Sequence, residues 1–381
     1  MSAGQPSSLS LYVHVPFCSS RCGYCDFNTY TATELGNEVR RDSFHEVLAA
    51  EVRIAAEQLA TSQQVSTVFV GGGTPTLLGS HGLNHVLQEI RDSFGLVEGA
   101  EVTTEANPDS VDQQMLEELR AGGFTRMSFG MQSSAPRVLQ VLDRTHTPGA
   151  SVQAAKWAVE AGFEHVNLDL IYGTPGETDD DLKSSINNAL SAGIDHLSAY
   201  ALIVEDGTAL SRRIARGELP APDDDVCADR YELIDQYMSA AGMTWYEVSN
   251  WARPGGECQH NLAYWRSQNW WGVGPGAHSH IDGKRWWNVK HPAPYAERVR
   301  AHEAPIADAE QLTSDDLRTE QVMLGVRLAE GMSAQSFDEA LLDGLVSRGL
   351  IEQSARGDGR VQLTLAGRLL ADAVVRELLP N

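Results

Sequence analysis

Six short apolar runs alternate with amphipathic segments in the first half of this chain, and this alternation restricts the possible folds more than any other feature. The runs are residues 9–16, 66–72, 101–106, 126–132, 165–173 and 196–204, each bounded by glycine, proline or polar residues. Helical patterns between them include residues 43–60, 110–123 and 180–194. Repeated strand–helix units predict an α/β fold with a parallel sheet, here a partial (β/α)6 barrel over residues 1–205.

Two further regions are predicted after the barrel, because 381 residues exceed one ordinary domain. Residues 206–309 are expected to form an α+β extension. The tail, residues 310–381, is expected to be a small winged-helix-like domain with helices at 314–331 and 337–353, a hairpin at 354–367 around Gly357–Gly359, and a last helix from 368.

The charge of the chain argues against nucleic-acid binding. The net charge is -23, which would repel phosphate backbones and anionic lipid. Residues 313–381 hold 7 basic and 11 acidic side chains, a balance of -4, so the tail is expected to act as a lid or a docking domain and not as a DNA reader.

Cysteine usage and hydropathy indicate a cytoplasmic protein. Three of the five cysteines lie within eight residues, too close for a disulfide scaffold, so metal or redox chemistry in a reducing compartment is favoured. The N-terminus lacks a signal-peptide pattern, and no run of about 18 apolar residues predicts a transmembrane segment. Peripheral contact with a membrane stays open.

The clustered cysteines, Cys18, Cys22 and Cys25, form a C-x3-C-x2-C array that leaves several metal chemistries open. A structural zinc site needs four ligands, and His14 or Asp26 could supply the fourth. Cys227 and Cys258 stand alone, outside any such pair. A thioredoxin-like pair would use only Cys22 and Cys25. Thiolates also suit iron–sulfur clusters, and three of them would leave one iron of a cubane open.

Polar or glycine-rich residues follow the predicted strands at the point where each strand ends. They are Cys18, Gly71–Thr74, Glu105, Gln132 and Asp169. The carboxyl ends of parallel barrel strands share one face, and that face carries the chemistry. The sequence therefore predicts a single site built from separate segments.

At these residues the chain resembles the radical S-adenosylmethionine (SAM) superfamily. The C-x3-C-x2-C array matches the loop that holds a 4Fe-4S cluster in that family, and GGGTPT at 71–76 resembles its GGG(T/E)P motif, which contacts the SAM amino group. The resemblance implies a cluster on Cys18, Cys22 and Cys25, SAM on the open iron, and an electron donor to the cluster. Phe27 would help to shield that cluster.

Further motifs narrow the resemblance to the coproporphyrinogen dehydrogenase-related branch, over most of residues 10–300. They are LYVHVPFCSSRCGYCDF, TTEANPDS, RMSFGMQS, DRTHT and NLDLIYGTPGET. Two SAM molecules can bind near the cluster in that branch. The resemblance assigns Tyr12, Gly72 and Glu105 to the first SAM, and Tyr24, Gly73, Thr74, Gln132, Arg144 and Asp169 to the second. Alternatively, Arg144 and Asp169 form a structural salt bridge.

One departure from the enzymes of this branch points to a chaperone. Those enzymes carry a further cysteine where this chain has Phe27, whereas the related heme chaperones of the HemW type lack it and carry an H-N-x-x-Y-W signature, here HNLAYW at 260–265. The resemblance implies heme binding, with His260 as an iron ligand and Tyr264, Trp265, Trp270 and Trp271 packed on the macrocycle. His260 could instead be an ordinary core histidine, and His278 and His280 are further candidate ligands.

The resemblance therefore implies a heme chaperone with a 4Fe-4S cluster, SAM and heme, which delivers heme to an apo-hemoprotein. One alternative is a radical SAM oxidoreductase that decarboxylates coproporphyrinogen III in porphyrin biosynthesis without oxygen. Methylation or opening of a tetrapyrrole is a related possibility. A zinc-stabilised scaffold is the alternative from a different class.

Overall fold

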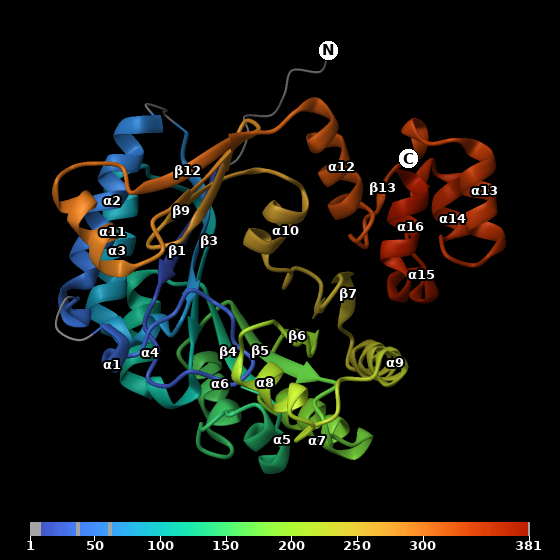
Figure 1. The fold of residues 1–381 in the computed structure, drawn as a ribbon, viewed down its shortest axis with the longest axis horizontal. Coiled ribbons are helices and arrows are strands. Elements are labelled where there is room, and N and C mark those ends of the chain that lie inside the picture. Colours follow the sequence, from blue (N-terminus) through green and yellow to red (C-terminus); the bar gives the residue numbers. More distant parts are fainter. Residues whose placement is uncertain (1–8, 36–38, 60–62, 380–381) are drawn as a thin grey trace.

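Six parallel strands form the centre of the fold in the computed structural model, which describes residues 9–35, 39–59 and 63–379 (Figure 1). The strands are β1 (Leu9–Val15), β2 (Val65–Gly72), β3 (Leu96–Ala106), β4 (Arg126–Gln132), β5 (His165–Tyr172) and β6 (His196–Ala201). They pair in chain order, each parallel to the next. The prediction of a mostly parallel α/β sheet is thus confirmed.

Helices cover the outer face of these strands. They are α2 (Phe44–Leu59), α3 (Gly79–Ser93), α4 (Gln113–Gly122), α6 (Ala150–Glu160) and α7 (Asp179–Leu190), while the short helices α1 (Ala32–Leu35) and α5 (Pro136–Val141) lie in the connections between strands. On β1, Leu11 and Val13 are fully buried, while Tyr12 lines a cavity inside the sheet. Because successive strand side chains point to opposite faces, this alternation separates the helix-packed core from the interior of the sheet.

The segment after β6 extends the same sheet at both edges. Its helices are α8 (Ala209–Ala215), α9 (Asp224–Ala240), α10 (Gln259–Trp265) and α11 (Pro292–Arg300), and its strands are β7 (Thr244–Glu247), β8 (Asn250–Ala252), β9 (Asn269–Val273), β10 (His278–Ile281), β11 (Lys284–Asn288) and β12 (Ile306–Gln311). Strand β8 pairs antiparallel with β6, and β9 pairs parallel with β1.

Within the described residues, the resulting order is β12-β11-β10-β9-β1-β2-β3-β4-β5-β6-β8-β7, an open sheet with two edges. Residues of the extension, such as Trp251 and Tyr295, belong to the same hydrophobic core as the first half of the chain. Strand β12 also continues past residue 309, the predicted end of the extension. The extension and the barrel therefore share one sheet and one core.

The tail has a core of its own, which includes Val326, Leu345 and Val374. Its elements are α12 (Ser314–Gly325), β13 (Met332–Ser333), α13 (Glu339–Ser347), α14 (Gln353–Gly357), β14 (Arg360–Val361), α15 (Leu365–Leu369) and α16 (Ala371–Leu378). The hairpin predicted at 354–367 differs, because its first arm is α14. Strand β14 pairs with β13 instead, and a single bridge joins Ile351 to Leu363.

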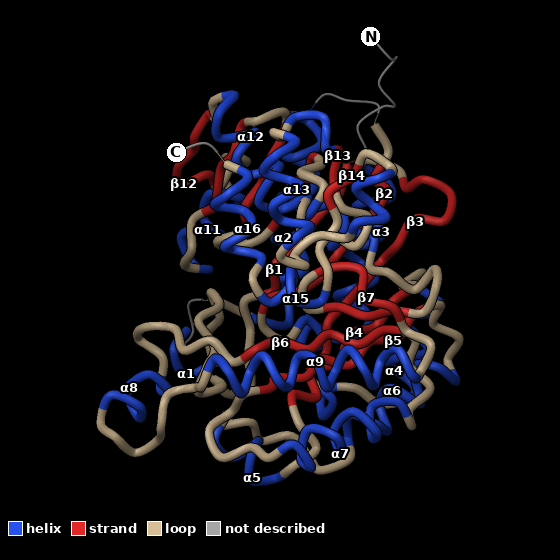
Figure 2. The backbone as a smooth tube through the Cα atoms, turned by 90° about the vertical axis from the view of Figure 1, so that its right-hand side faces the viewer, coloured by secondary structure: helices blue, strands red, loops and turns tan. Residues whose placement is uncertain are grey.

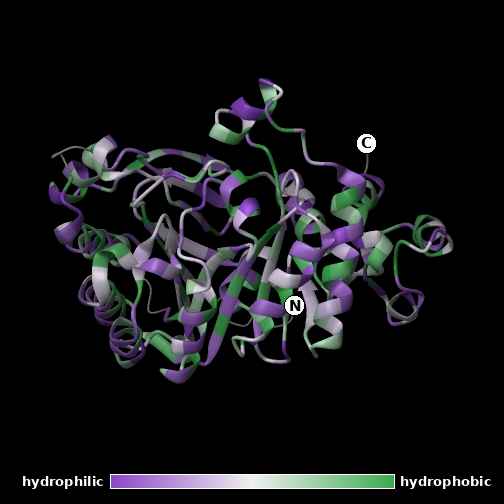
Figure 3. Cartoon of the chain, turned by 90° about the horizontal axis from the view of Figure 1, so that it is seen from below, coloured by the Kyte–Doolittle hydropathy of each residue, from purple (hydrophilic) through white to green (hydrophobic). Residues whose placement is uncertain are grey.

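Figures 2 and 3 show how the helices are arranged and which residues they carry. In Figure 2, α9 runs beside α7, with which it is in contact. Individual helices in Figure 3 carry both hydrophilic and hydrophobic residues, as expected for helices with one packed face. In the described part of the chain, no helix is both long and apolar enough to cross a membrane.

Candidate functional site

The three clustered cysteines lie on the loop that follows β1, residues 16–30, called the cysteine loop below. Cys18, Cys22 and Cys25 are partly buried and form no disulfide. The Cys18 N–H donates to the Tyr30 carbonyl at 3.0 Å, and the Gly23 N–H donates to the Leu142 carbonyl at 3.0 Å. The loop is therefore held at both its start and its middle by backbone hydrogen bonds.

The donor set of this loop fits an iron–sulfur cluster better than a single zinc ion. Arg144 Nη1 donates to Cys22 Sγ at 3.4 Å, which places a cation where thiolate charge would gather. Of the two proposed fourth zinc ligands, His14 has both ring nitrogens engaged, with the Tyr12 hydroxyl at 3.0 Å and the Asn28 carbonyl at 2.9 Å, and Asp26 is exposed.

The spacing of the side chains points the same way. Among the residues that the structure describes, no three His, Cys, Asp or Glu side chains converge as ligands of one metal ion. A cubane cluster does not require such convergence, because each thiolate binds a different iron. The cysteine loop thus fits the 4Fe-4S prediction.

The glycine loop, residues 71–76, packs directly against the cysteine loop. The Gly73 N–H donates to the Val15 carbonyl at 2.8 Å, and the Thr74 N–H donates to the Phe17 carbonyl at 2.7 Å. Gly72 has a φ of +108°, which favours glycine. A Cβ atom on Gly73 would overlap the Phe17 carbonyl oxygen, so only glycine fits this close approach.

We expect Gly73→Ala to loosen the junction of these two loops and to reduce the free energy of unfolding by about 1–3 kcal/mol, because the obstacle is backbone and not a movable side chain. Thermal unfolding of the full chain measures the loss. Gly344→Ala in α13 is the matched control, since its Cβ would meet nothing within 4 Å. Equal stability of the two variants would show that the close approach is unimportant.

The residues assigned to the first SAM molecule lie together. Tyr12, Gly72 and Glu105 come from three neighbouring strands and line one cavity of about 830 Å³, called the large cavity below. The Gly72 N–H donates to Glu105 Oε2 at 3.1 Å. Burial, aided by the nearby Asp169 charge and opposed by this hydrogen bond, raises the pKa of Glu105 to about 8. Glu105 is therefore ready to take up or release a proton near neutral pH.

Of the residues assigned to the second SAM molecule, Gln132 and Tyr24 lie near Arg144. Arg144 Nη2 donates to the Gly130 carbonyl at 2.9 Å, and the Gln132 side-chain amide lies beside the same Gly130. Gln132 has a φ of +63°, a left-handed conformation that is uncommon for a residue other than glycine. Tyr24 belongs to the cysteine loop; burial, aided by the Cys22 charge, raises its pKa, while the Arg144 charge opposes the rise, so its side chain lies near Arg144.

The alternative of an Arg144–Asp169 salt bridge is not what the structure has. Within the described residues, Asp169 instead accepts hydrogen bonds from Ser128 Oγ at 3.1 Å and Asn167 Nδ2 at 2.7 Å. Burial raises the pKa of Asp169, while these hydrogen bonds and the Arg144 charge oppose the rise. Arg144 and Asp169 are therefore close but separately held, so each keeps hydrogen-bonding capacity for a ligand.

The large cavity is also lined by apolar side chains from distant segments. They are Phe27, Tyr264, Trp265, Trp270, Met323 and Leu324. Phe27 lines the cavity and is 62% exposed, so its ring is not packed in a core. Trp271 does not contribute, because it points to the opposite face of β9 and packs on Trp286 at 4.8 Å between ring centroids. Wide apolar walls of this kind suit a flat ligand.

His260 lies behind the wall of the large cavity in a defined tautomer. Thr67 Oγ1 donates its proton to Ser10 at 2.8 Å, so it must accept from His260 Nδ1–H, also at 2.8 Å. His260 Nε2 then accepts from the Tyr264 hydroxyl at 3.0 Å. Burial lowers the pKa of His260 to about 4, so the ring is neutral at pH 7.

The two other candidate histidines differ in their access to the large cavity. His278 lines it and stacks on Trp287 at 5.6 Å between ring centroids. His280 is buried beside Trp270 at 5.0 Å, away from the lining, and no partner in the described residues reaches either of its ring nitrogens. The structure therefore separates three histidines that sequence alone could not rank.

Comparison with known proteins identifies the family. The Radical SAM superfamily profile matches residues 12–189. A Mycobacterium tuberculosis protein named heme chaperone HemW is 56% identical over 379 residues, covering 99% of this chain and 95% of that protein. The chain belongs to the heme chaperone HemW family of radical SAM proteins. The Bacillus subtilis HemW is 34% identical, with 96% of this chain and 97% of that protein covered.

A solved structure supports the same fold for this HemW family member. The coproporphyrinogen III oxidase HemN from Escherichia coli aligns with a TM-score of 0.82 at 24% identity, covering 98% of this chain and 90% of that one. At this identity the likeness shows the fold alone. The match extends through the tail, so the whole architecture is shared with a radical SAM protein.

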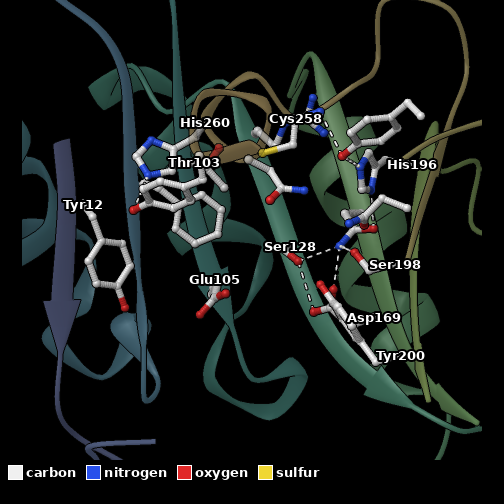
Figure 4. Close-up of a pocket in the computed structure, with 17 residues that line it drawn as sticks. Tyr12, Thr103, Glu105, Ser128, Asp169, His196, Ser198, Tyr200, Cys258 and His260 are labelled. Carbon is white, nitrogen blue, oxygen red and sulfur yellow. Dashed lines mark hydrogen bonds between the residues drawn. The ribbon is translucent and has the colours of Figure 1, made fainter. Parts of the chain in front are cut away.

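Sequence reasoning missed the polar interior of this HemW family member (Figure 4). Asn167 Nδ2 lies 2.8 Å from Ser128 Oγ and 2.9 Å from Ser198 Oγ and shares its two protons among these hydroxyls and Asp169, and Asn167 Oδ1 lies 2.7 Å from His196 Nδ1. His196 Nε2 contacts the Tyr246 hydroxyl at 2.8 Å. Ser128, Asn167, His196 and Ser198 occupy the inward positions of β4, β5 and β6, and Tyr246 lies on β7. Asn167 lies two residues before Asp169 on the same predicted strand. Because residues two apart in a strand share one face, this spacing could have predicted that Asn167 also points into the interior.

Proposed function

We propose that this chain is a heme chaperone that binds a 4Fe-4S cluster, SAM and heme, and delivers heme to apo-hemoproteins. The observation that carries the proposal is the 56% identity, over nearly the entire chain, to a protein named heme chaperone HemW. Phe27, at the position where the enzymes of the branch carry a further cysteine, supports it. The likeness to coproporphyrinogen III oxidase concerns the fold, so decarboxylation of coproporphyrinogen III remains the alternative.

Cys18, Cys22 and Cys25 would hold the cluster, which when bound supplies a reducible centre with one open iron for SAM. The residues around it would bind and orient SAM. Backbone groups of the glycine loop approach closely because Gly72 and Gly73 carry no side chain, and Glu105 can accept from amine or ribose hydroxyl donors. Arg144 supplies a planar donor for a carboxylate.

Heme would occupy the large cavity as the cargo. The volume of this cavity, about 830 Å³, lies in the usual range for ligand sites. Trp265 and Trp270 offer flat apolar surfaces. Iron would bind His260 Nε2, whose lone pair is set by the hydrogen bond from Nδ1–H to Thr67 and is covered by the Tyr264 hydroxyl. Tyr264 must therefore give up this hydrogen bond when heme binds.

We further propose that the chaperone works in the cytoplasm. Its partners would be an apo-hemoprotein acceptor and an electron donor to the cluster, with peripheral contact at a membrane where the acceptor is membrane-bound. The net charge of -23 disfavours unspecific association with nucleic acid or anionic lipid, which supports a protein acceptor.

Heme titration tests the proposal. We expect the wild-type chain to bind heme with a shifted Soret band and to pass it to an apo-hemoprotein such as apomyoglobin. His260→Ala should bind heme at least about tenfold more weakly and lose the spectrum of a histidine-ligated iron. Tyr264→Phe is the matched variant: it removes the hydroxyl that covers Nε2, so heme binding should be retained or strengthened.

Two outcomes would redirect the proposal. Robust formation of protoporphyrinogen IX from coproporphyrinogen III, by cluster-loaded protein with SAM and a reductant, would favour the enzyme. An unchanged spectrum in His260→Ala together with its loss in His278→Ala would move the iron ligand to His278, which lines the large cavity.

A further inference from the structure

The wall of the large cavity contains an arginine that is held by exchangeable partners. Arg285 on β11 is the one Arg or Lys among the described residues that line this cavity. Its Nη2 donates to Glu320 Oε1 at 2.5 Å, and its Nη1 lies 3.3 Å from Glu310 Oε1. The Arg285 side chain is 25% exposed and that of Glu320 is 30% exposed. Both are therefore accessible to a ligand.

The partner of Arg285 comes from the tail. Glu320, Met323 and Leu324 lie at positions i, i+3 and i+4 of α12, so they share one helix face, and all three line the large cavity. The Arg285–Glu320 pair thus joins the sheet to the first helix of the tail beside the space that a ligand would occupy.

Exchange of this partner is energetically easy. Ion pairs that remain partly exposed contribute little to stability, so loss of the Glu320 contact costs little. A ligand carboxylate in place of Glu320 would restore the same charge-assisted bonds, because a guanidinium can bind either carboxylate through its planar fork. Arg285 is therefore suited to hold a carboxylate of the protein when the cavity is empty and a carboxylate of the ligand when it is full.

The strand register places Arg285 at a suitable distance from the aromatic wall. Trp270 on β9 pairs with His280 on β10, and His280 pairs with Arg285 on β11, so these residues share one face of the sheet. Two strand spacings, about 10 Å, separate Trp270 from Arg285. One flat ligand that packs on Trp270 can therefore also reach Arg285 across the same face of the sheet.

We propose that Arg285 binds a propionate carboxylate of the tetrapyrrole, and that Glu320 pairs with the Arg285 guanidinium while no tetrapyrrole is bound. This inference rests on the proposed function and adds the recognition of the acid groups. The carboxylate of SAM is the other source of the same chemistry, and the experiment separates the two.

The test compares heme with heme dimethyl ester, whose propionates carry no charge, in titrations of the full chain. Wild type should bind heme more tightly than the ester. Arg285→Gln should weaken heme binding about tenfold and leave the ester unchanged, and Arg285→Lys should keep part of the preference. Glu320→Gln should strengthen heme binding, because it removes the competing carboxylate. Thermal unfolding checks that each variant is folded.

Arg266→Gln is the matched control. Arg266 makes a similar ion pair with Glu330, with Nη2 and Oε2 2.7 Å apart, but it does not line the large cavity. Its loss should leave the ratio of heme to ester affinity unchanged. Equal weakening of heme and ester by Arg285→Gln, or no gain in Glu320→Gln, would overturn the inference. So would a loss of SAM binding without loss of heme binding.

One further outcome concerns the proposed function. If the wild-type chain binds neither porphyrin, heme binding fails and this inference fails with it. If wild type binds heme and Arg285→Gln binds it equally well, only the role of Arg285 is wrong.

Discussion

Cys22→Ser is expected to leave the chain folded but nearly free of iron and inorganic sulfide after anaerobic reconstitution, compared with about four irons per chain in wild type. Cys22 lies between the two other cysteines and receives the Arg144 hydrogen bond at 3.4 Å, so its loss removes one of three ligands and the sulfur that faces this cation. Serine preserves the size of the side chain. Iron and sulfide analysis, together with the visible absorption of the cluster, measures the effect.

Cys227→Ser is the matched control for this experiment. Cys227 is also a partly buried free thiol, but it lies on α9 and its sulfur approaches Gly173. We expect this variant to keep its full iron content. Loss of iron in both variants, or retention in both, would contradict the assignment of the cluster to the cysteine loop.

The central strands could be predicted from sequence because they are both local and strongly patterned. Each predicted run from 9–16 to 196–204 overlaps a strand of the parallel sheet, with ends that differ by a few residues. These strands are covered by helices on one face, so apolar residues such as Leu11 and Val13 repeat at every second position. The motif residues at the strand ends then follow from the shared direction of the strands.

Arrangements that depend on distant segments could not be predicted. Asn28 in the cysteine loop donates to the Pro275 carbonyl at 3.0 Å and to the Lys290 carbonyl at 2.8 Å, contacts that join residues about 250 positions apart. The pairing of β9 with β1 is of the same kind. No local periodicity encodes such contacts. The prediction of a hairpin at 354–367 was wrong for a related reason, because β14 pairs with β13, which lies outside the predicted hairpin.

The candidate site shows the same division between local and distant information. The motifs gave Tyr12, Gly72 and Glu105, which do line one cavity. They could not give the tautomer of His260, which depends on Thr67 far away in sequence. The motifs also led to the prediction that Trp271 packs on the ligand. Neighbouring residues of a strand face opposite sides, so of Trp270 and Trp271 it is Trp270 that lines the large cavity.

Glu105→Gln is expected to weaken SAM binding by about 10- to 100-fold and to remove most of its pH dependence. The pKa of Glu105 is about 8, raised first by burial and then by the Asp169 charge. At pH 7 the group is therefore mostly protonated. Donors of SAM bind the ionised form better, so wild-type affinity should rise as pH increases from 6 towards 8, by up to about tenfold per pH unit below the pKa.

A rise in pH should strengthen SAM binding but lower the free energy of unfolding, so two separate measurements test the role of Glu105. Because the pKa of Glu105 is raised on folding, its contribution to the free energy of unfolding is present at low pH and is lost as pH rises towards 8. Glu105→Gln should therefore bind SAM more weakly, yet lose less stability than wild type between pH 6 and 8. Equilibrium dialysis with SAM and thermal unfolding measure the two effects. Glu98→Gln, on the exposed amino-terminal part of β3, is the matched control and should change neither. Wild-type affinity that is constant over this range, or that falls with pH, would show that Glu105 does not bind SAM as a carboxylate.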